Sequence, residues 1–162
     1  TRMAGHDKTT AAGEKFLKEL QELSQMQVRV GFQRGKKHKG KGKRAGADLV
    51  DIALYNEIGT DTIPSRPFLA QTVDQQGEAI KQASAELVVQ VVEGKMKGKQ
   101  ALKNIGVLVK GAVRHQMVEG EFVPNAPSTI QRKGSDKPLI DTGQLRQGVS
   151  YKICRKGEYD DV

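Results

Sequence analysis

Three histidines are the residues most suited to acid–base or metal chemistry, because imidazole titrates near neutral pH and is a common metal ligand. They are His6, His38 and His115, which fall in three separate segments, and none belongs to a recognisable catalytic or metal-binding motif. The single cysteine, Cys154, allows neither a disulfide within the chain nor a cysteine-based metal cluster. The sequence therefore predicts no metal, no cofactor and no catalytic histidine.

A second possible catalytic group is the carboxyl of Asp141, which is followed by Thr142 and Gly143. The same triplet occurs in the loop that carries the catalytic carboxylate of aspartic proteases, where two such carboxylates share a proton. Here the triplet is present once, and a polar segment typical of a helix start follows it. We favour a structural interpretation in which Asp141 caps the turn through Gln144, and we predict that the chain is not an enzyme.

The strongest charge feature is a basic segment at residues 33–47, which contains no acid and no Phe, Tyr or Trp. The formal net charge of the chain is +8, and the seven cations of this segment account for all but one unit of it. The spacing of its glycines and lysines does not match a Walker loop, so any function of the segment is electrostatic. The seven cations are Arg34, Lys36, Lys37, Lys39, Lys41, Lys43 and Arg44.

The basic segment has three interpretations from sequence alone. Its cations could contact the phosphate backbone of DNA, they could contact an acidic rim on another protein, or the segment could be a flexible loop exposed to solvent. The absence of an aromatic ring for base stacking argues against recognition of a single strand.

The elements around the basic segment follow from apolar periodicity. An amphipathic helix is predicted over residues 14–25, and alternation of apolar and polar residues predicts a strand over 26–32. After the basic segment, Asp48 is suited to cap a helix that ends at Gly59. Residues 60–67 read as extended chain because prolines occur there. The predicted inner face of the capped helix is Leu49, Ile52, Ala53 and Ile58.

Two long helices are predicted over residues 69–93 and 99–119, forming an antiparallel hairpin. Residues 120–141 are predicted to form an extended arm, and a second strand at 149–154 is expected to pair with the first. The prediction is an α+β fold, with a small antiparallel sheet packed against two long helices. The predicted apolar seams are Val73, Gly77, Ile80, Ser84, Leu87 and Val91 on the first helix, and Leu102, Ile105, Val109, Ala112 and Gln116 on the second.

The predicted domain organisation is a flexible N-terminus (1–13), one α+β domain (14–155) and a C-terminal tail (156–162). The sequence has no apolar run long enough to span a membrane and no apolar signal segment near its start. We therefore expect a soluble protein with no membrane partner.

Two segments resemble the tail-component and minor tail protein Z-like family of tailed phages, whose members join heads to tails or complete tails. The resemblance runs from about residue 26 to residue 154 and includes the VRVGF strand, while the long lysine-rich insertion departs from the family pattern. The first segment contains Asn56, Glu57, Gly59 and Thr60, followed by Pro64, Arg66, Pro67 and Phe68; the second contains Pro138, Leu139, Asp141, Thr142, Gly143 and Leu145.

The resemblance implies a structural virion subunit, made in the host cytoplasm, at the neck or the head-proximal end of the tail. It would form a ring of six or twelve copies around the DNA channel, next to portal or adaptor proteins and tail-terminator or tail-tube proteins. Arg66 would pair with an acid such as Glu57 or with a neighbouring subunit, Phe68 would anchor the extended segment, and residues 121–141 would clasp the next subunit. The candidate interface residues are Glu57, Arg66, Pro67, Phe68, Pro138, Leu139, Asp141 and Leu145.

The resemblance leaves the basic segment with two possible contacts, DNA in the channel or an acidic neighbouring protein. A strongly cationic channel wall would retard DNA during ejection, so we favour a protein-facing or rim position. The alternative function is a nucleic-acid-binding protein that uses the basic segment together with residues 95–103 as a phosphate-binding surface.

Overall fold

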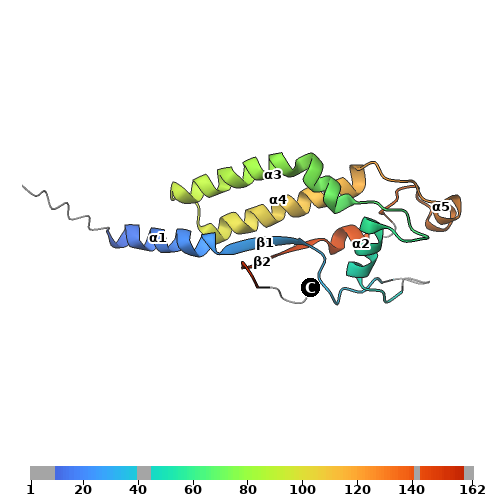
Figure 1. Cartoon of the computed structure of the whole chain (residues 1–162), viewed down its shortest axis with the longest axis horizontal. Helices are drawn as coiled ribbons and strands as arrows, with labels where there is room; N and C mark the ends of the chain where they lie inside the picture. The colour runs from blue at the N-terminus through green and yellow to red at the C-terminus, as the bar shows by residue number, and fades with distance from the viewer. Residues whose placement is uncertain (1–9, 40–44, 141–142, 159–162) are drawn as a thin grey trace, which may run out of the picture.

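The computed structural model describes residues 10–39, 45–140 and 143–158. Two long helices lie side by side above a two-stranded sheet, and a further helix extends from one end of the molecule (Figure 1). The fold is therefore a helix-rich mixed fold with a small antiparallel sheet, which confirms the predicted fold class. The elements are α1 (Ala11–Ser24), β1 (Met26–Gly31), α2 (Leu49–Ile58), α3 (Phe68–Val92), α4 (Gly98–Glu119), α5 (Pro127–Lys133), α6 (Gln144–Gly148) and β2 (Ser150–Arg155).

The sheet brings together the N-terminal and C-terminal parts of the domain. β1 and β2 pair antiparallel with Val28 opposite Ile153, so the predicted pairing is confirmed. α4 packs on one face of this sheet, where Tyr151 lies directly against Gly106. A Cβ on Gly106 would lie 2.3 Å from the tyrosine ring, so only glycine permits this approach of helix and strand.

The long helices form the predicted hairpin, with Gly94 at φ 71° in the turn between them. The seam of α3 differs from the prediction at its start, because Val73 is 67% exposed while Phe68 and Thr72 are buried. The α3–α4 contact is polar in part: Gln116 is buried, and its amide group donates to Gln71 Oε1 at 3.0 Å. Steps of three and four residues fit more than one helix face, which is why periodicity alone misplaced the start of this seam, while Val91 at its end is buried as predicted.

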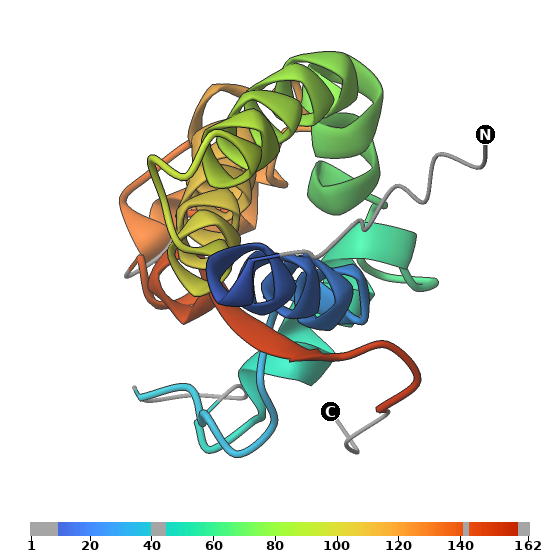
Figure 2. The ribbon, with the colours of Figure 1, turned by 90° about the vertical axis from the view of Figure 1, so that its left-hand side faces the viewer.

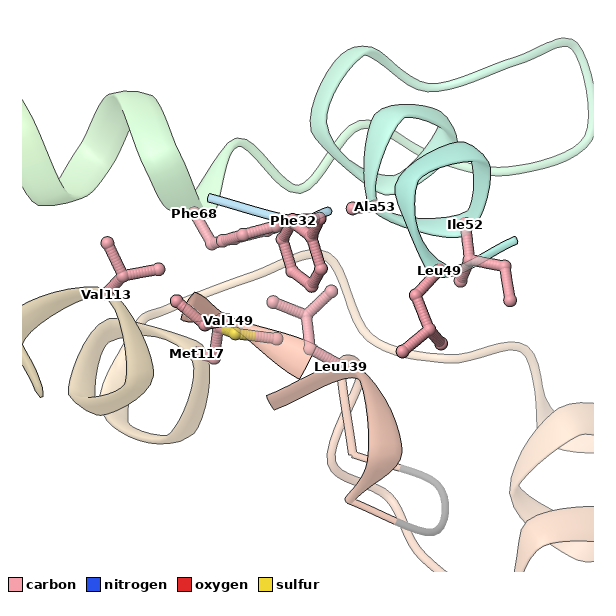
Figure 3. Close-up of a cluster of buried hydrophobic side chains, with 9 residues drawn as sticks. All are labelled: Phe32, Leu49, Ile52, Ala53, Phe68, Val113, Met117, Leu139 and Val149. Carbon is pink, nitrogen blue, oxygen red and sulfur yellow. The ribbon is translucent and has the colours of Figure 1, made fainter. Parts of the chain in front are cut away.

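The main hydrophobic core lies at one end of the molecule, where β1, α2, the start of α3, the end of α4 and the arm converge (Figure 3). The rings of Phe32 and Phe68 meet edge to face, with centroids 6.1 Å apart. This geometry is favourable for aromatic pairs. The core cluster consists of Phe32, Leu49, Ile52, Ala53, Phe68, Val113, Met117, Leu139 and Val149.

Several predicted boundaries and faces need correction. α1 begins at Ala11, so the segment predicted to be a flexible N-terminus (1–13) includes the first residues of this helix. Ile58 is 65% exposed and does not belong to the inner face of α2. The predicted arm is not extended throughout, because Pro127 sits at the start of α5, where its missing N–H costs nothing.

Candidate assembly junction and basic hairpin

The segment between α2 and α3 is a tight loop rather than plain extended chain. Gly59 has φ 78°, and a Cβ there would lie 2.9 Å from the backbone nitrogen of Ser65. Asn56 is buried, and its side-chain amide donates to Ile52 O at 2.7 Å. The backbone carbonyl of Asn56 accepts from Arg66 N at 2.6 Å. Thr60 closes the loop by exchanging backbone hydrogen bonds with Ile63. The Asn56 to Thr60 cluster therefore shapes the loop that leads into α3.

Glu57 caps α3. Its carboxylate oxygens accept from the backbone N–H groups of Leu69 at 3.0 Å and Ala70 at 2.9 Å. These donors belong to the first turn of α3, where no helical carbonyl can reach them. The negative charge of Glu57 is also attracted to the positive end of the helix dipole, which stabilises the start of the helix. The acid that the sequence suggested as a partner of Arg66 thus stabilises a helix end.

Arg66 binds the start of the arm. Its side chain is buried, and it donates to Val123 O at 2.9 Å, Pro124 O at 3.3 Å and Asn125 Oδ1 at 3.2 Å. Asn125 is itself buried and donates in turn to Lys137 O at 3.2 Å. Hydrogen bonds from a charged donor are the stronger kind, so Arg66 holds the α2–α3 loop and both ends of the arm together. We call this set of contacts the junction.

The two segments of the resemblance therefore meet in space, since Leu139 from the second segment packs in the same core cluster as Phe68 from the first. This corrects the predicted interface set. Phe68 is fully buried and Leu139 is 5% exposed, so both side chains stabilise the single chain and present no surface to a neighbour. The buried Arg66 acts in the same way.

Four candidate interface residues keep part of their surface: Glu57, Pro67, Pro138 and Leu145 are half-buried. Leu145 also packs against the core from the side. Asp141 lies outside the described residues, so its predicted cap stays a prediction.

The basic segment forms a β-hairpin stalk in its described part. Lys37 bridges Asp48 in antiparallel fashion, and His38 N donates to Ala47 O at 2.7 Å, with Gly46 N donating back to His38 O at 3.1 Å. The predicted flexible loop is thus paired at both of its ends, and we call residues 33–39 and 45–48 the basic hairpin.

Asp48 fastens the base of the basic hairpin. One carboxylate oxygen accepts from Val50 N at 3.0 Å, as the predicted N-cap of α2, and the other accepts from Gly35 N at 2.7 Å. These two backbone hydrogen bonds, assisted by the charges of Arg34 and Lys37, hold the pKa of the Asp48 carboxyl below its ordinary value.

Gln144 connects the basic hairpin to the start of α6. Its amide oxygen accepts from Lys39 N at 2.6 Å, and its amide nitrogen donates to Lys39 O. The described cations of the hairpin are exposed around this fixed backbone; they are Arg34, Lys36, Lys37 and Lys39. Lys41, Lys43 and Arg44 lie outside the described residues.

The possible catalytic groups are not brought together. His115 is exposed on α4, His38 is in the basic hairpin, and His6 lies outside the described residues. Across the described part of the chain, no group of three or more His, Cys, Asp or Glu residues could hold a metal ion. Cys154 is buried and accepts a hydrogen bond from the amide of Gln27.

The feature that sequence reasoning missed is a large amount of exposed apolar surface on the helices. The pairs of neighbouring valines on α3 were the available signal, because two adjacent residues of a helix cannot both face the same seam. The exposed large apolar residues are Leu17 on α1, Leu54, Tyr55 and Ile58 on α2, Val73, Val88, Val89 and Val92 on α3, Val107 and Leu108 on α4, and Val123 on the arm.

No family model, curated protein or solved structure matches this chain. Among the described residues, none of the helices has the length and apolar character needed to cross a lipid bilayer.

Proposed function

We propose that the chain is a structural subunit of a tailed-phage virion that assembles with copies of itself into a ring at the neck or at the head-proximal end of the tail. The observation that carries the proposal is the exposed apolar surface of α2, α3 and α4. Nine large apolar side chains are exposed on these three helices: Leu54, Tyr55 and Ile58 on α2, Val73, Val88, Val89 and Val92 on α3, and Val107 and Leu108 on α4. Contiguous exposed apolar surface on a protein commonly marks a protein contact, and the α2 group and the Val88, Val89 and Val92 group each consist of neighbours on one helix.

The positions of these side chains favour a ring over a two-fold dimer. α2 carries one exposed group at the core end of the molecule, and Val88, Val89 and Val92 form another near the far end of α3 (Figure 1). A ring subunit needs two different surfaces that fit each other head to tail, and the chain offers two separate apolar groups for this purpose.

The junction supports the phage-specific part of the proposal. The residues that carry the resemblance are the ones that cap α3 and hold the arm, namely Glu57, Arg66 and Phe68 with Leu139. They would fix the direction in which the arm and α2 are presented to a neighbouring subunit. Residues with such a role are those that a family of ring subunits would share.

The virion location can be tested on particles of the phage that encodes this chain. An antibody raised against the full chain should label the junction between head and tail, and quantitative mass spectrometry of purified particles should find six or twelve copies per particle. Absence of the chain from purified particles would contradict the proposal.

A further inference from the structure

The first helix, α1, carries apolar side chains that its own chain leaves largely uncovered. Phe16 and Leu17 lie four and three residues before Leu20, so the three side chains are neighbours on one face of the helix. Leu17 is 56% exposed, Phe16 and Leu20 are half-buried, and no residue of α1 is buried. We call Phe16, Leu17 and Leu20 the α1 group.

Most of α1 projects from the domain. It is joined to α4 near its C-terminal end, where Leu23 lies against Gly98 and the carboxylate of Glu19 accepts from Gly98 N at 2.9 Å. The other end of α1 extends past the ends of α3 and α4 (Figure 1). A helix of 14 residues is marginal in water when nothing packs against it. The projecting part of α1 is therefore stabilised if a partner covers the α1 group.

The α1 group lies at the end of the molecule where α3 finishes. Figure 2 looks at this end, with α1 nearest the viewer and α3 above it. α2 lies at the opposite end (Figure 1). The exposed apolar residues of the last turns of α3 form the α3 group, Val88, Val89 and Val92, and those of α2 form the α2 group, Leu54, Tyr55 and Ile58.

The α2 and α3 groups alone are too small for a stable contact between copies. A standard interface buries about 800 Å² on each partner and involves about 20–30 residues a side. Each of the two groups supplies three large apolar side chains. The α1 group adds three more to the surface at the α3 end of the molecule, and this addition brings the contact closer to the size that a stable ring needs.

We propose that the α1 group packs on the α2 group of the neighbouring copy, so that α1 reaches from one subunit to the next. The inference rests on the proposed ring and names the pair of helices that makes its contact. Phe16 and Leu20 are four residues apart, as are Leu54 and Ile58, and such rows form the ridges that fit the grooves of a second helix. Pairing of α1 with another α1 would be two-fold and would give a dimer instead of a ring.

The charges of α1 do not suit a lipid surface or a nucleic acid. The helix carries Lys15 and Lys18 together with Glu14, Glu19 and Glu22, so its acids outnumber its bases. Helices that lie on membranes are rich in Lys and Arg on their polar face, and contacts with phosphate groups need cations. An apolar protein surface is the partner that fits α1.

Crosslinking between copies tests the contact. A chain with Leu17→Cys is co-expressed with an affinity-tagged chain with Leu54→Cys, and the assembled protein is treated with a short bis-maleimide. The wild type is the control for Cys154, which is buried and should not react. The product that joins residue 17 of one copy to residue 54 of another should exceed about tenfold the product from the matched variant Glu22→Cys, because only thiols held together react at high effective concentration. Glu22 is exposed on another side of α1.

The inference is overturned if rings of full mass give no more of the 17–54 product than the Glu22→Cys control does; the proposed ring would then stand without this contact. It is also overturned if residue 17 joins Val89→Cys or a second residue 17 instead, since α1 would then cover the α3 group or another α1. Residue 17 that is protected from maleimide only in whole particles would assign the α1 group to another virion protein. A wild type that is monomeric at every concentration would remove the ring and this inference together.

A chain that begins at Gln25 gives a second readout, because it lacks the α1 group. The protein concentration at which half of it is assembled, measured by light scattering, should rise about tenfold or more, since three anchor side chains leave each contact. Urea unfolding of the same chain separates loss of the ring from loss of the fold. A folded chain with an unchanged assembly midpoint would contradict the proposed role of α1.

Discussion

Arg66 illustrates what the sequence reveals at the scale of a single residue and what it does not. Its place between two prolines in a resembling segment marked it as a candidate, but its partners are backbone carbonyls of the arm nearly sixty residues further on. A carbonyl has no sequence signature, so these partners could not be predicted. The same holds for Glu57, whose partners are backbone N–H groups of α3.

Replacement of Arg66 by Met should destabilise the chain by about 2 kcal/mol, because the buried side chain of Asn125 and the part-buried carbonyls of Val123 and Pro124 would lose their charged donor. Urea unfolding followed by circular dichroism measures the change. Arg132→Met, on the exposed surface of α5, is the control and should change stability by less than about 0.5 kcal/mol. Equal effects of the two substitutions would show that Arg66 does not hold the arm.

Two glycines of α4 should respond in opposite directions to alanine. At Gly106 the added Cβ would lie 2.3 Å from the Tyr151 ring, so Gly106→Ala should destabilise the chain by about 1–3 kcal/mol. Gly111 has no atom within 4 Å of an added Cβ, so Gly111→Ala should stabilise the helix by up to about 1 kcal/mol. Thermal unfolding of both variants checks the pair, and a stabilised Gly106→Ala variant would contradict the packing of α4 on the sheet.

The stability of the base of the basic hairpin should depend on pH through the ionisation of the Asp48 carboxyl. A carboxyl whose pKa is lowered in the folded chain contributes stability above its ordinary value of 3.8, and that contribution is lost as the pH falls through the lower folded value. The amide NMR signals of Gly35 and Val50 should therefore shift together, with a midpoint below 3.8. A shared midpoint above that value, or no shift at all, would contradict the two hydrogen bonds to Asp48.

At the scale of elements, long periodic segments were predicted well and short ones were not. The hairpin of α3 and α4 and the pairing of β1 with β2 followed from pattern, because their apolar repeats extend over several turns or alternations. α5 was missed because seven residues between Ala126 and Gly134 give too little periodicity. The stalk of the basic hairpin was missed because its backbone pairing and its link to Gln144 leave no apolar signal.

α1 should be dispensable for folding of the rest of the chain. It has no buried residue, and its packing on the domain is limited to the end near Leu23 and Glu19, which contact Gly98. Figure 1 shows this helix at the end of the molecule opposite α2, and Figure 2 looks at that end, with α1 nearest the viewer. A chain that begins at Gln25 should unfold cooperatively in urea with a free energy of unfolding lower by about 1 kcal/mol, because it loses the hydrogen bond from Gly98 N to Glu19 at the start of α4. Loss of cooperative unfolding on this truncation would contradict that assignment.

At the scale of the whole molecule, two features have separate roles in this account. The junction holds one chain together at its core end, and the exposed apolar groups of α2, α3 and α4 are the surfaces proposed to contact further copies. The sequence predicted the core helices and the charge of the basic segment. It could not predict which apolar residues stay exposed, because that depends on how α3 is rotated against α4.

The mass of the protein in solution tests the central claim, self-assembly through the apolar helix faces, most directly. Light scattering of the wild type should give a discrete species of six or twelve times 17.7 kDa. Val89→Lys/Val92→Lys should reduce it to a monomer, because two charges would enter the apolar contact, whereas Gln75→Lys/Gln82→Lys adds the same charge at polar exposed positions of α3 and should leave the ring intact. A wild type that stays monomeric at every concentration, or a ring unaffected by lysines at Val89 and Val92 and at the exposed α2 residues Leu54 and Ile58, would contradict the account.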